Sequence, residues 1–151
     1  MTTTICIDAN FVILLLSLQG TESVYENHWN QWQEDNYELV APILFGYEVA
    51  NAFHRAAKAG QITAKEAQSL LESSLSLGIN FYSDDELHIQ ALKIAQRLNL
   101  SASYDAHYLA LAERLEIEFW TADQRLFNSV QSSLPWVNLV TLESTMLNVE
   151  K

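Results

Sequence analysis

Thr4-Ile5-Cys6-Ile7-Asp8 is the stretch that decides the fold, because a short apolar run stops directly at a carboxylate. Near the other end of the chain, Asp123 follows the apolar run Phe119-Trp120-Thr121 in a similar way. Both runs are predicted to be strands. In open α/β sheets, ligands bind beyond the carboxyl ends of the strands. Asp8 and Asp123 are therefore expected to share a site at one edge of a parallel sheet.

The rest of the chain alternates between strand-like and helix-like segments. Strands are expected at 3–7, 38–41, 79–82, 117–121 and 137–141, with helices at 9–18, 22–35, 42–58, 63–77, 84–98, 103–116 and from 123. Pro42 is placed to open its helix, Thr63 and Glu66 form a capping-box pattern, and Ser103 is an expected cap. Such alternation implies a parallel sheet covered by helices on both faces. With no linker or repeat visible, residues 1–151 are expected to form one domain.

Two further acids stand at positions where a helix should face the core. Glu48 lies within a helical stripe of apolar residues, and Asp105 lies on another. The stripes are Phe45, Val49, Ala52, Phe53, Ala56 and Tyr108, Leu109, Ala112. A carboxylate in such a place loses hydration and must be paired, protonated or bound to a cation. Lys and Arg number only 8 against 19 acids. A divalent metal is the simplest partner, and oxygen ligands favour Mg²⁺ or Mn²⁺ over zinc.

Composition narrows the class of protein. Apolar residues make up 49% of the chain and charged ones 18%, which fits a helix-rich globule. The apolar run 11–18 is too short to cross a bilayer, and no basic residue precedes it as in a secretory signal. Cys6 is the single cysteine and gives no disulfide framework. A cytoplasmic protein with no membrane partner is expected.

The net charge of −11 bears on which partners the protein can have. Nucleic-acid binders usually present basic surfaces, because phosphate contacts supply much of their affinity. A nucleic-acid substrate would therefore need bridging metal ions or a small local basic patch. The acidity also suits a basic protein partner.

Other catalytic chemistries are poorly represented. The sequence has no G-x-S-x-G, C-x-x-C, G-x-G-x-x-G or G-x-x-x-x-G-K-[ST] motif. His107 is two residues from Asp105, so on a helix it points roughly 200° away from that carboxylate. His54 is similarly off the face of Glu48, and His28 and His88 have no companion ligand in the sequence pattern. All four histidines are interpreted as structural or surface groups.

Four segments together resemble the PIN-domain nucleases, and most closely the small ribonuclease toxins of VapC type. The segments are Asp8-Ala-Asn10, Glu48-Val-Ala-Asn51, Tyr104-Asp-Ala-His-Tyr-Leu-Ala-Leu-Ala112 and Thr121-Ala-Asp123-Gln-Arg-Leu126. The resemblance spans nearly the whole chain. It implies a three-layer α/β/α fold around a central parallel sheet of about five short strands.

The same resemblance implies a site and an activity. The predicted catalytic and metal-binding residues are Asp8, Glu48, Asp105 and Asp123, with Asn10 and Thr121 as polar supports and Arg125, Arg55 and Lys58 as candidate phosphate contacts. One or two Mg²⁺ or Mn²⁺ ions would activate water and stabilise the leaving oxygen during hydrolysis of an RNA phosphodiester. The implied partners are a second copy of the chain and an antitoxin whose basic segment occludes the site.

Several alternatives remain open at this point. RNase H-like nucleases share the order of acids, but they place antiparallel hairpins where this chain is helical. A receiver domain would want a lysine near a late strand end, and a haloacid-dehalogenase-type phosphatase would want an aspartate where Asn10 stands. A catalytically weak or inactive PIN-like module, acting through protein or RNA binding, is the alternative from a different functional class.

Overall fold

Five parallel strands form the centre of the structure, a computed structural model that describes residues 2–141. The strands are β1 (Thr4–Ile7), β2 (Glu38–Pro42), β3 (Asn80–Tyr82), β4 (Glu118–Thr121) and β5 (Val137–Leu139). Their order across the sheet is β3-β2-β1-β4-β5, and every neighbouring pair is parallel. The first strand is thus the central one, and its three apolar residues are fully buried.

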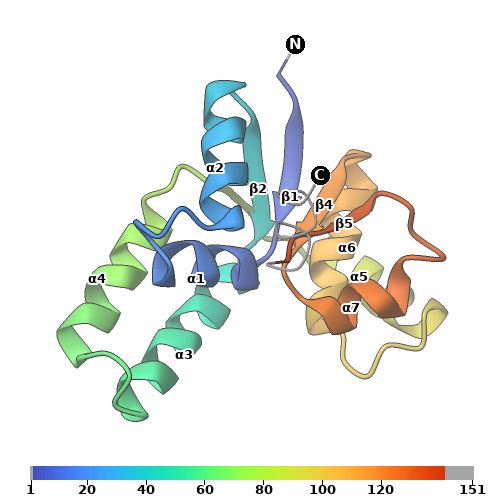
Figure 1. Ribbon diagram of the computed structural model, residues 1–151. Helices are drawn as coiled ribbons and strands as arrows, with labels where there is room; N and C mark the ends of the chain where they lie inside the picture. Colours follow the sequence, from blue (N-terminus) through green and yellow to red (C-terminus); the bar gives the residue numbers. More distant parts are fainter. Residues whose placement is uncertain (1, 142–151) are drawn as a thin grey trace.

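Helices cover both faces of this sheet. They are α1 (Ala9–Ser17), α2 (Val24–Glu34), α3 (Leu44–Lys58), α4 (Ala64–Leu75), α5 (Asp85–Arg97), α6 (Tyr104–Leu115) and α7 (Gln124–Val130). Figure 1 shows α1–α4 grouped on one side of the sheet and α5–α7 on the other. The predicted three-layer α/β/α architecture is confirmed. The prediction of one domain over 1–151 extends to residues 142–151, which lie outside the described residues.

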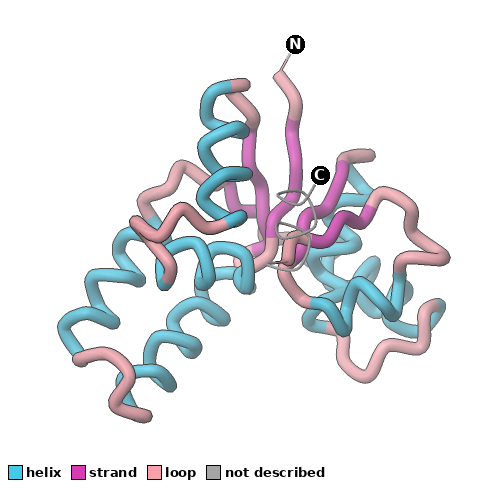
Figure 2. The backbone as a smooth tube through the Cα atoms, viewed as in Figure 1, coloured by secondary structure: helices cyan, strands magenta, loops and turns pink. Residues whose placement is uncertain are grey.

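The direction of the chain across the sheet explains this division. From β1 through β2 to β3 the chain moves toward one edge, and it then returns past β1 to reach β4 and β5. Figure 2 shows the strands lying between the two groups of helices. Because parallel crossovers are right-handed, a reversal of direction moves the connecting helices to the opposite face. The strand order therefore switches between β1 and β4, where α/β proteins place their ligands.

Helix α6 forms the layer of helix that packs on the sheet at the switch point. It packs against β1, β2 and β4, and α5 packs against it. Its residues 108–112 are all buried, which fits its nearly continuous apolar sequence. On the other face, Phe11 of α1 and Phe45 of α3 are completely buried. Together these side chains form the core that holds the strand ends in place.

Of the three predicted helix starts, the capping box is confirmed, Pro42 is wrong, and Ser103 caps its helix by position alone. Thr63 and Glu66 form the predicted capping box at α4, and Asp84 is the cap of α5. The prediction that Pro42 opens α3 is wrong, since Pro42 is the last residue of β2 and pairs with Tyr82. Ser103 occupies the N-cap position of α6 without a side-chain capping hydrogen bond.

Among residues 2–141, no helix is both long and apolar enough to cross a membrane.

Removal of the cap of α4 should weaken the fold. In the Thr63→Ala variant, the N–H of Glu66 loses its bond to the Thr63 hydroxyl. We expect the free energy of unfolding to fall by about 1 kcal/mol, measured by urea denaturation. Ser69→Ala removes a hydroxyl from the exposed surface of the same helix and is the matched control. Equal stability of the two variants would show that the capping box does not stabilise α4.

Candidate active site

Asp8 is a buried carboxylate at the end of β1. Its side chain is only 5% exposed. One carboxylate oxygen accepts a hydrogen bond from the backbone N–H of Phe11 at 2.9 Å, which caps α1. The other accepts a short hydrogen bond from the hydroxyl of Thr121, at the end of β4. Both oxygens are thus fixed by groups at the switch point of the sheet.

Burial dominates the ionisation of Asp8. It raises the pKa of this carboxyl from its ordinary 3.8 to about 7. The hydrogen bonds from Thr121, Phe11 and the Ala122 backbone oppose the shift, and the negative charge of Asp105 adds to it. Asp8 therefore holds a proton over much of the range below neutral pH. A bound cation would favour the ionised form instead.

Thr121 connects the ends of β1 and β4. Its completely buried hydroxyl donates to Asp8 and accepts a hydrogen bond from the backbone N–H of Asp123 at 2.9 Å. The Asp123 side chain in turn accepts from the Leu126 N–H at 3.1 Å and caps α7. Asp8, Thr121 and Asp123 are thereby joined through one hydroxyl group.

Glu48 lies in α3, the helix that follows β2. In the sheet, β2 and β4 lie on opposite sides of β1. The half-buried carboxylate of Glu48 accepts a hydrogen bond from the phenol of Tyr108, with an O–O distance of 2.6 Å. Burial raises the pKa of Glu48, the Tyr108 bond lowers it, and the charge of Asp105 raises it again. Burial and the nearby Glu48 charge also raise the pKa of Tyr108, so its hydroxyl remains a donor.

Asp105 couples the four acids electrostatically. It lies half-buried in the first turn of α6, and burial followed by the charge of Asp123 raises its pKa. Its own charge raises the pKa of both Asp8 and Glu48. The structure thus places Asp8, Glu48 and Asp123 within electrostatic reach of Asp105, although the four acids come from four different elements.

The carboxylate oxygens of the four acids suit a hard cation, but they do not form a complete set of metal ligands. Within residues 2–141, no group of three or more acidic, histidine or cysteine side chains stands close enough to hold one metal ion. Like charges repel one another, and Asp8 and Glu48 each already hold a hydrogen-bond donor. Carboxylate oxygens are nevertheless the ligands that Mg²⁺ and Mn²⁺ prefer. Asp8, Glu48, Asp105 and Asp123 could hold such an ion once their side chains converge.

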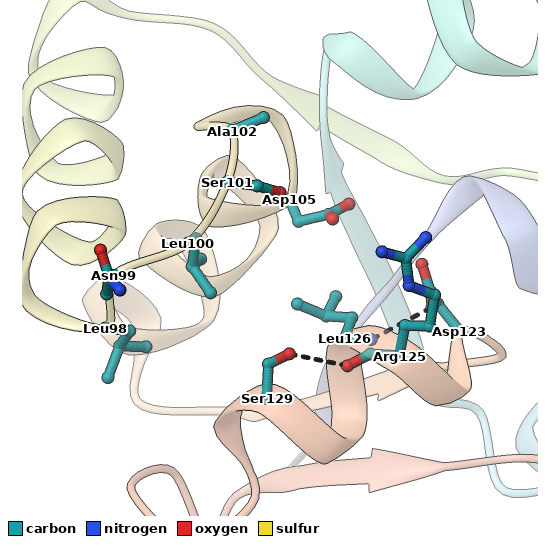
Figure 3. A pocket seen from close by; sticks show the side chains of 10 residues that line it. All are labelled: Leu98, Asn99, Leu100, Ser101, Ala102, Asp105, Asp123, Arg125, Leu126 and Ser129. Carbon is teal, nitrogen blue, oxygen red and sulfur yellow. Dashed lines mark hydrogen bonds between the residues drawn. The ribbon is translucent and has the colours of Figure 1, made fainter.

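A cleft of about 530 Å³ opens beside Asp105 and Asp123. In Figure 3 the carboxylate of Asp105 and the guanidinium of Arg125 point toward one another across it. Arg125 lies in α7 and is exposed. The cleft therefore combines acids on its inner wall with a cation at its rim, an arrangement that can hold a phosphate through both a metal ion and an arginine.

Asn10, Arg55 and Lys58, which were also predicted to belong to the site, do not line this cleft. Asn10 is exposed in the first turn of α1. Arg55 and Lys58 are exposed in the last turn of α3. No role for Tyr108 was predicted from the sequence. Its position three residues after Asp105 on an apolar stripe was the available signal, because a buried phenol usually needs an acceptor.

The interpretation of the histidines needs one correction. His88 of α5 was expected to lack a companion, but its Nδ1 lies 2.9 Å from Nε2 of His107 in α6. The pairing arises because α5 packs along α6, which local sequence does not show. His28 contacts the rings of Trp32 and Trp120, and burial lowers its pKa. His54 is exposed on α3.

The raised pKa of Asp8 makes stability depend on pH. The folded state holds this proton more tightly than the unfolded state, so Asp8 reduces stability progressively as pH rises from about 4 to 7. In metal-free buffer, Asp8→Asn removes this cost. We expect the gain in the free energy of unfolding to be larger at pH 8 than at pH 5 by about 2–3 kcal/mol.

Urea denaturation with EDTA at both pH values measures this difference. Asp35→Asn, at the exposed end of α2, is the matched control and should show little pH-dependent gain. A gain for Asp8→Asn that is equal at pH 5 and pH 8 would contradict the raised pKa.

Comparisons with known proteins agree with this geometry. The PIN domain family model matches residues 5–131. VapC ribonuclease Mb0985 of Mycobacterium bovis and ribonuclease VapC9 of Mycobacterium tuberculosis are each 35% identical over 97 residues, which is 64% of this chain and 74% of theirs.

Two crystal structures show the same fold. PAE2754 from Pyrobaculum aerophilum has a TM-score of 0.68 at 22% identity, covering 99% of this chain and 98% of its own. The second is VapBC2 from Rickettsia felis, whose structure was solved with a DNA fragment from its own promoter. It has a TM-score of 0.66 at 14% identity, covering 91% of this chain and 98% of that chain. The family match over residues 5–131 and the two mycobacterial relatives settle the classification: the chain belongs to the PIN domain family and, within it, to the VapC type.

Proposed function

We propose that the protein is an endoribonuclease that hydrolyses RNA phosphodiester bonds with the help of Mg²⁺ or Mn²⁺. The observation that carries this proposal is the electrostatic coupling of Asp8, Glu48 and Asp123 to Asp105 at the switch point of the sheet. Such costly proximity is offset when a cation binds. The named activity of the mycobacterial relatives supports RNA as the substrate.

Each residue of the site has a distinct task in this proposal. Asp8 and Asp105 are the principal ligands, and Glu48 and Asp123 complete the set directly or through water. Thr121 orients Asp8 through the hydrogen bond between them, which supports this task. When bound, the cation supplies Lewis-acid activation of water and neutralises charge at the phosphate. Tyr108 holds Glu48 through its 2.6 Å bond until the carboxylate is recruited.

The substrate would approach through the cleft at Asp105. A chain with a net charge of −11 repels RNA at long range. At short range, Arg125 at the rim provides a donor for a phosphate oxygen. The cations in the site reduce the remaining repulsion. Arg55 and Lys58 would contact phosphates only if the RNA extends along α3.

We assign the protein the role of toxin in a toxin–antitoxin pair that acts in the cytoplasm. An acidic cleft attracts a basic protein segment, and an arginine of that segment can compete with the metal for Asp8 or Asp105. This accounts for inhibition by a cognate antitoxin. We propose a homodimer as the form of the free toxin, which light scattering of the purified chain would test.

A second candidate function is that of a binding module without nuclease activity. Its support is the separation of the acids, no three of which are gathered around a common point within residues 2–141. In that case the cleft would hold only a protein or RNA partner. Cleavage assays separate the two functions.

The metal should stabilise the fold through Asp8 and Asp105. At a metal concentration of 100 times the dissociation constant, ligand linkage contributes about 2.7 kcal/mol, which raises Tm by several degrees. Asp8→Asn and Asp105→Asn should each remove the gain, whereas Asp35→Asn should retain it. Differential scanning calorimetry with Mn²⁺, Mg²⁺ or EDTA measures the shift. Melting of wild type that is identical in Mn²⁺ and EDTA would argue against the metal site.

Purified protein, freed of its antitoxin, should cut RNA only when Mg²⁺ or Mn²⁺ is present. We expect Asp105→Asn to lower the rate by on the order of 10²-fold or more, because a charged ligand of the site is lost. The assay is gel analysis of total RNA, with cleavage sites mapped by sequencing of 5′ ends. Asp35→Asn is the control that should cleave normally. Wild type that binds metal but cuts no RNA would favour the binding module.

A further inference from the structure

His88 and His107 form a pair at the surface, apart from the cleft at Asp105. His88 Nδ1 and His107 Nε2 are 2.9 Å apart, and the ring centroids are 5.0 Å apart with the planes at 71°. His88 is exposed and His107 half-buried. The two residues lie on α5 and α6, so the pair bridges two packed helices.

A backbone contact fixes the tautomer of His107. Its Nδ1 lies 2.7 Å from the carbonyl oxygen of Ser103. A carbonyl can only accept, so Nδ1 must carry the hydrogen. In the neutral ring the lone pair is then on Nε2, which is the nitrogen that faces His88. Metal-binding histidines are commonly oriented in this way, by donating their other N–H to a backbone carbonyl.

We propose that His88 and His107 together bind a divalent transition metal that prefers imidazole, such as Zn²⁺, Ni²⁺ or Cu²⁺. This site is separate from the carboxylates, whose oxygen atoms favour Mg²⁺ or Mn²⁺. Coordination requires both facing nitrogens to present lone pairs. His107 Nε2 already does so, and His88 does so when its proton resides on the other ring nitrogen.

The distance between the two nitrogens is close to what coordination needs. Zinc binds imidazole nitrogen at about 2.0–2.1 Å, so two such ligands at a tetrahedral angle are about 3.3 Å apart. The pair at 2.9 Å must therefore open by a few tenths of an ångström. The exposure of His88 allows this through a small side-chain rotation.

The charged groups around the pair favour a cation. Arg114, a basic side chain of α6, is held by both oxygens of Asp84 at 2.8 and 3.0 Å. The negative charge of Asp84 also acts on His88. Glu86, next to them in the first turn of α5, adds negative charge that acts on Arg114. Because Asp84 pairs with Arg114, the charge of this arginine is compensated and repels a metal ion at the histidines less.

The site would be open rather than fully enclosed by protein ligands. Within residues 2–141, no third histidine, cysteine or acid joins the pair to form a closed metal centre. The histidines border an apolar cleft of about 250 Å³ that is also lined by Tyr47, Tyr82 and Tyr104. Water would fill the remaining coordination positions. Binding would link α5 to the first turn of α6, which also contains Asp105.

Electron paramagnetic resonance of Cu²⁺ provides the test. Untagged full-length protein is given one equivalent of Cu²⁺ in excess Mg²⁺, which occupies the carboxylates. We expect nitrogen splitting from two imidazoles, and a titration of Zn²⁺ by calorimetry should give one ion per chain. His88→Ala and His107→Ala should each abolish the two-nitrogen signal and weaken Zn²⁺ binding by about tenfold or more.

His54→Ala, which removes an exposed histidine from α3, is the matched control and should leave both measurements unchanged. Circular dichroism checks that each variant is folded. His88 is exposed, so its replacement should disturb the fold less than that of the half-buried His107, and His88→Ala is the decisive variant. Nitrogen splitting from fewer than two imidazoles in the wild type overturns the proposal, as does a two-nitrogen signal that persists in His88→Ala. Mn²⁺-dependent stabilisation should be the same in His88→Ala and wild type, so failure of this site and failure of the nuclease proposal are distinguishable.

Discussion

The carboxyl group of Asp8, buried between the ends of β1 and β4, is the constraint on which the site depends. A pKa of about 7 in place of 3.8 corresponds to a cost of about 4 kcal/mol at alkaline pH. Domains of this size are stable by only about 5–15 kcal/mol. The hydrogen bonds from Phe11 and Thr121 already oppose the shift, so the cost would be larger without them. A site under such electrostatic strain releases free energy when a cation arrives.

The sheet topology determines which acidic side chains lie at the same edge of the sheet as Asp8. Because β1 is central and the chain reverses direction between β3 and β4, Asp8 and Asp123 are joined through the Thr121 hydroxyl although they are 115 positions apart. The first turn of α6 brings Asp105 to the same edge of the sheet. The next turn of this helix brings Tyr108 into hydrogen-bond contact with Glu48. One helix thus supplies one acid of the proposed site and the hydrogen bond that orients another.

The sequence predicted the parts of this arrangement that depend on local pattern. Apolar runs ending in acids located the strand ends, and helical spacing showed that Glu48 and Asp105 face inward. It failed where a contact joins distant segments. Pro42 reads locally as a helix opener, but its pairing with Tyr82 extends β2, and the N–H of Ile43 continues the ladder to the Tyr82 carbonyl at 3.0 Å. The bond from Tyr108 to Glu48 spans 60 residues, and no local pattern specifies it.

The first turn of α6 shows how helical geometry separates two kinds of ligand. Asp105 and His107 are two positions apart, so their side chains leave the helix in directions roughly 200° apart. Asp105 faces the cleft at the sheet edge, and His107 faces α5 and His88. The spacing that kept His107 out of the carboxylate site therefore placed it against a second imidazole. Carboxylate oxygens suit Mg²⁺ or Mn²⁺ and imidazole nitrogens suit Zn²⁺, Ni²⁺ or Cu²⁺, so in the two proposals one turn of helix contributes to two sites of different ligand type.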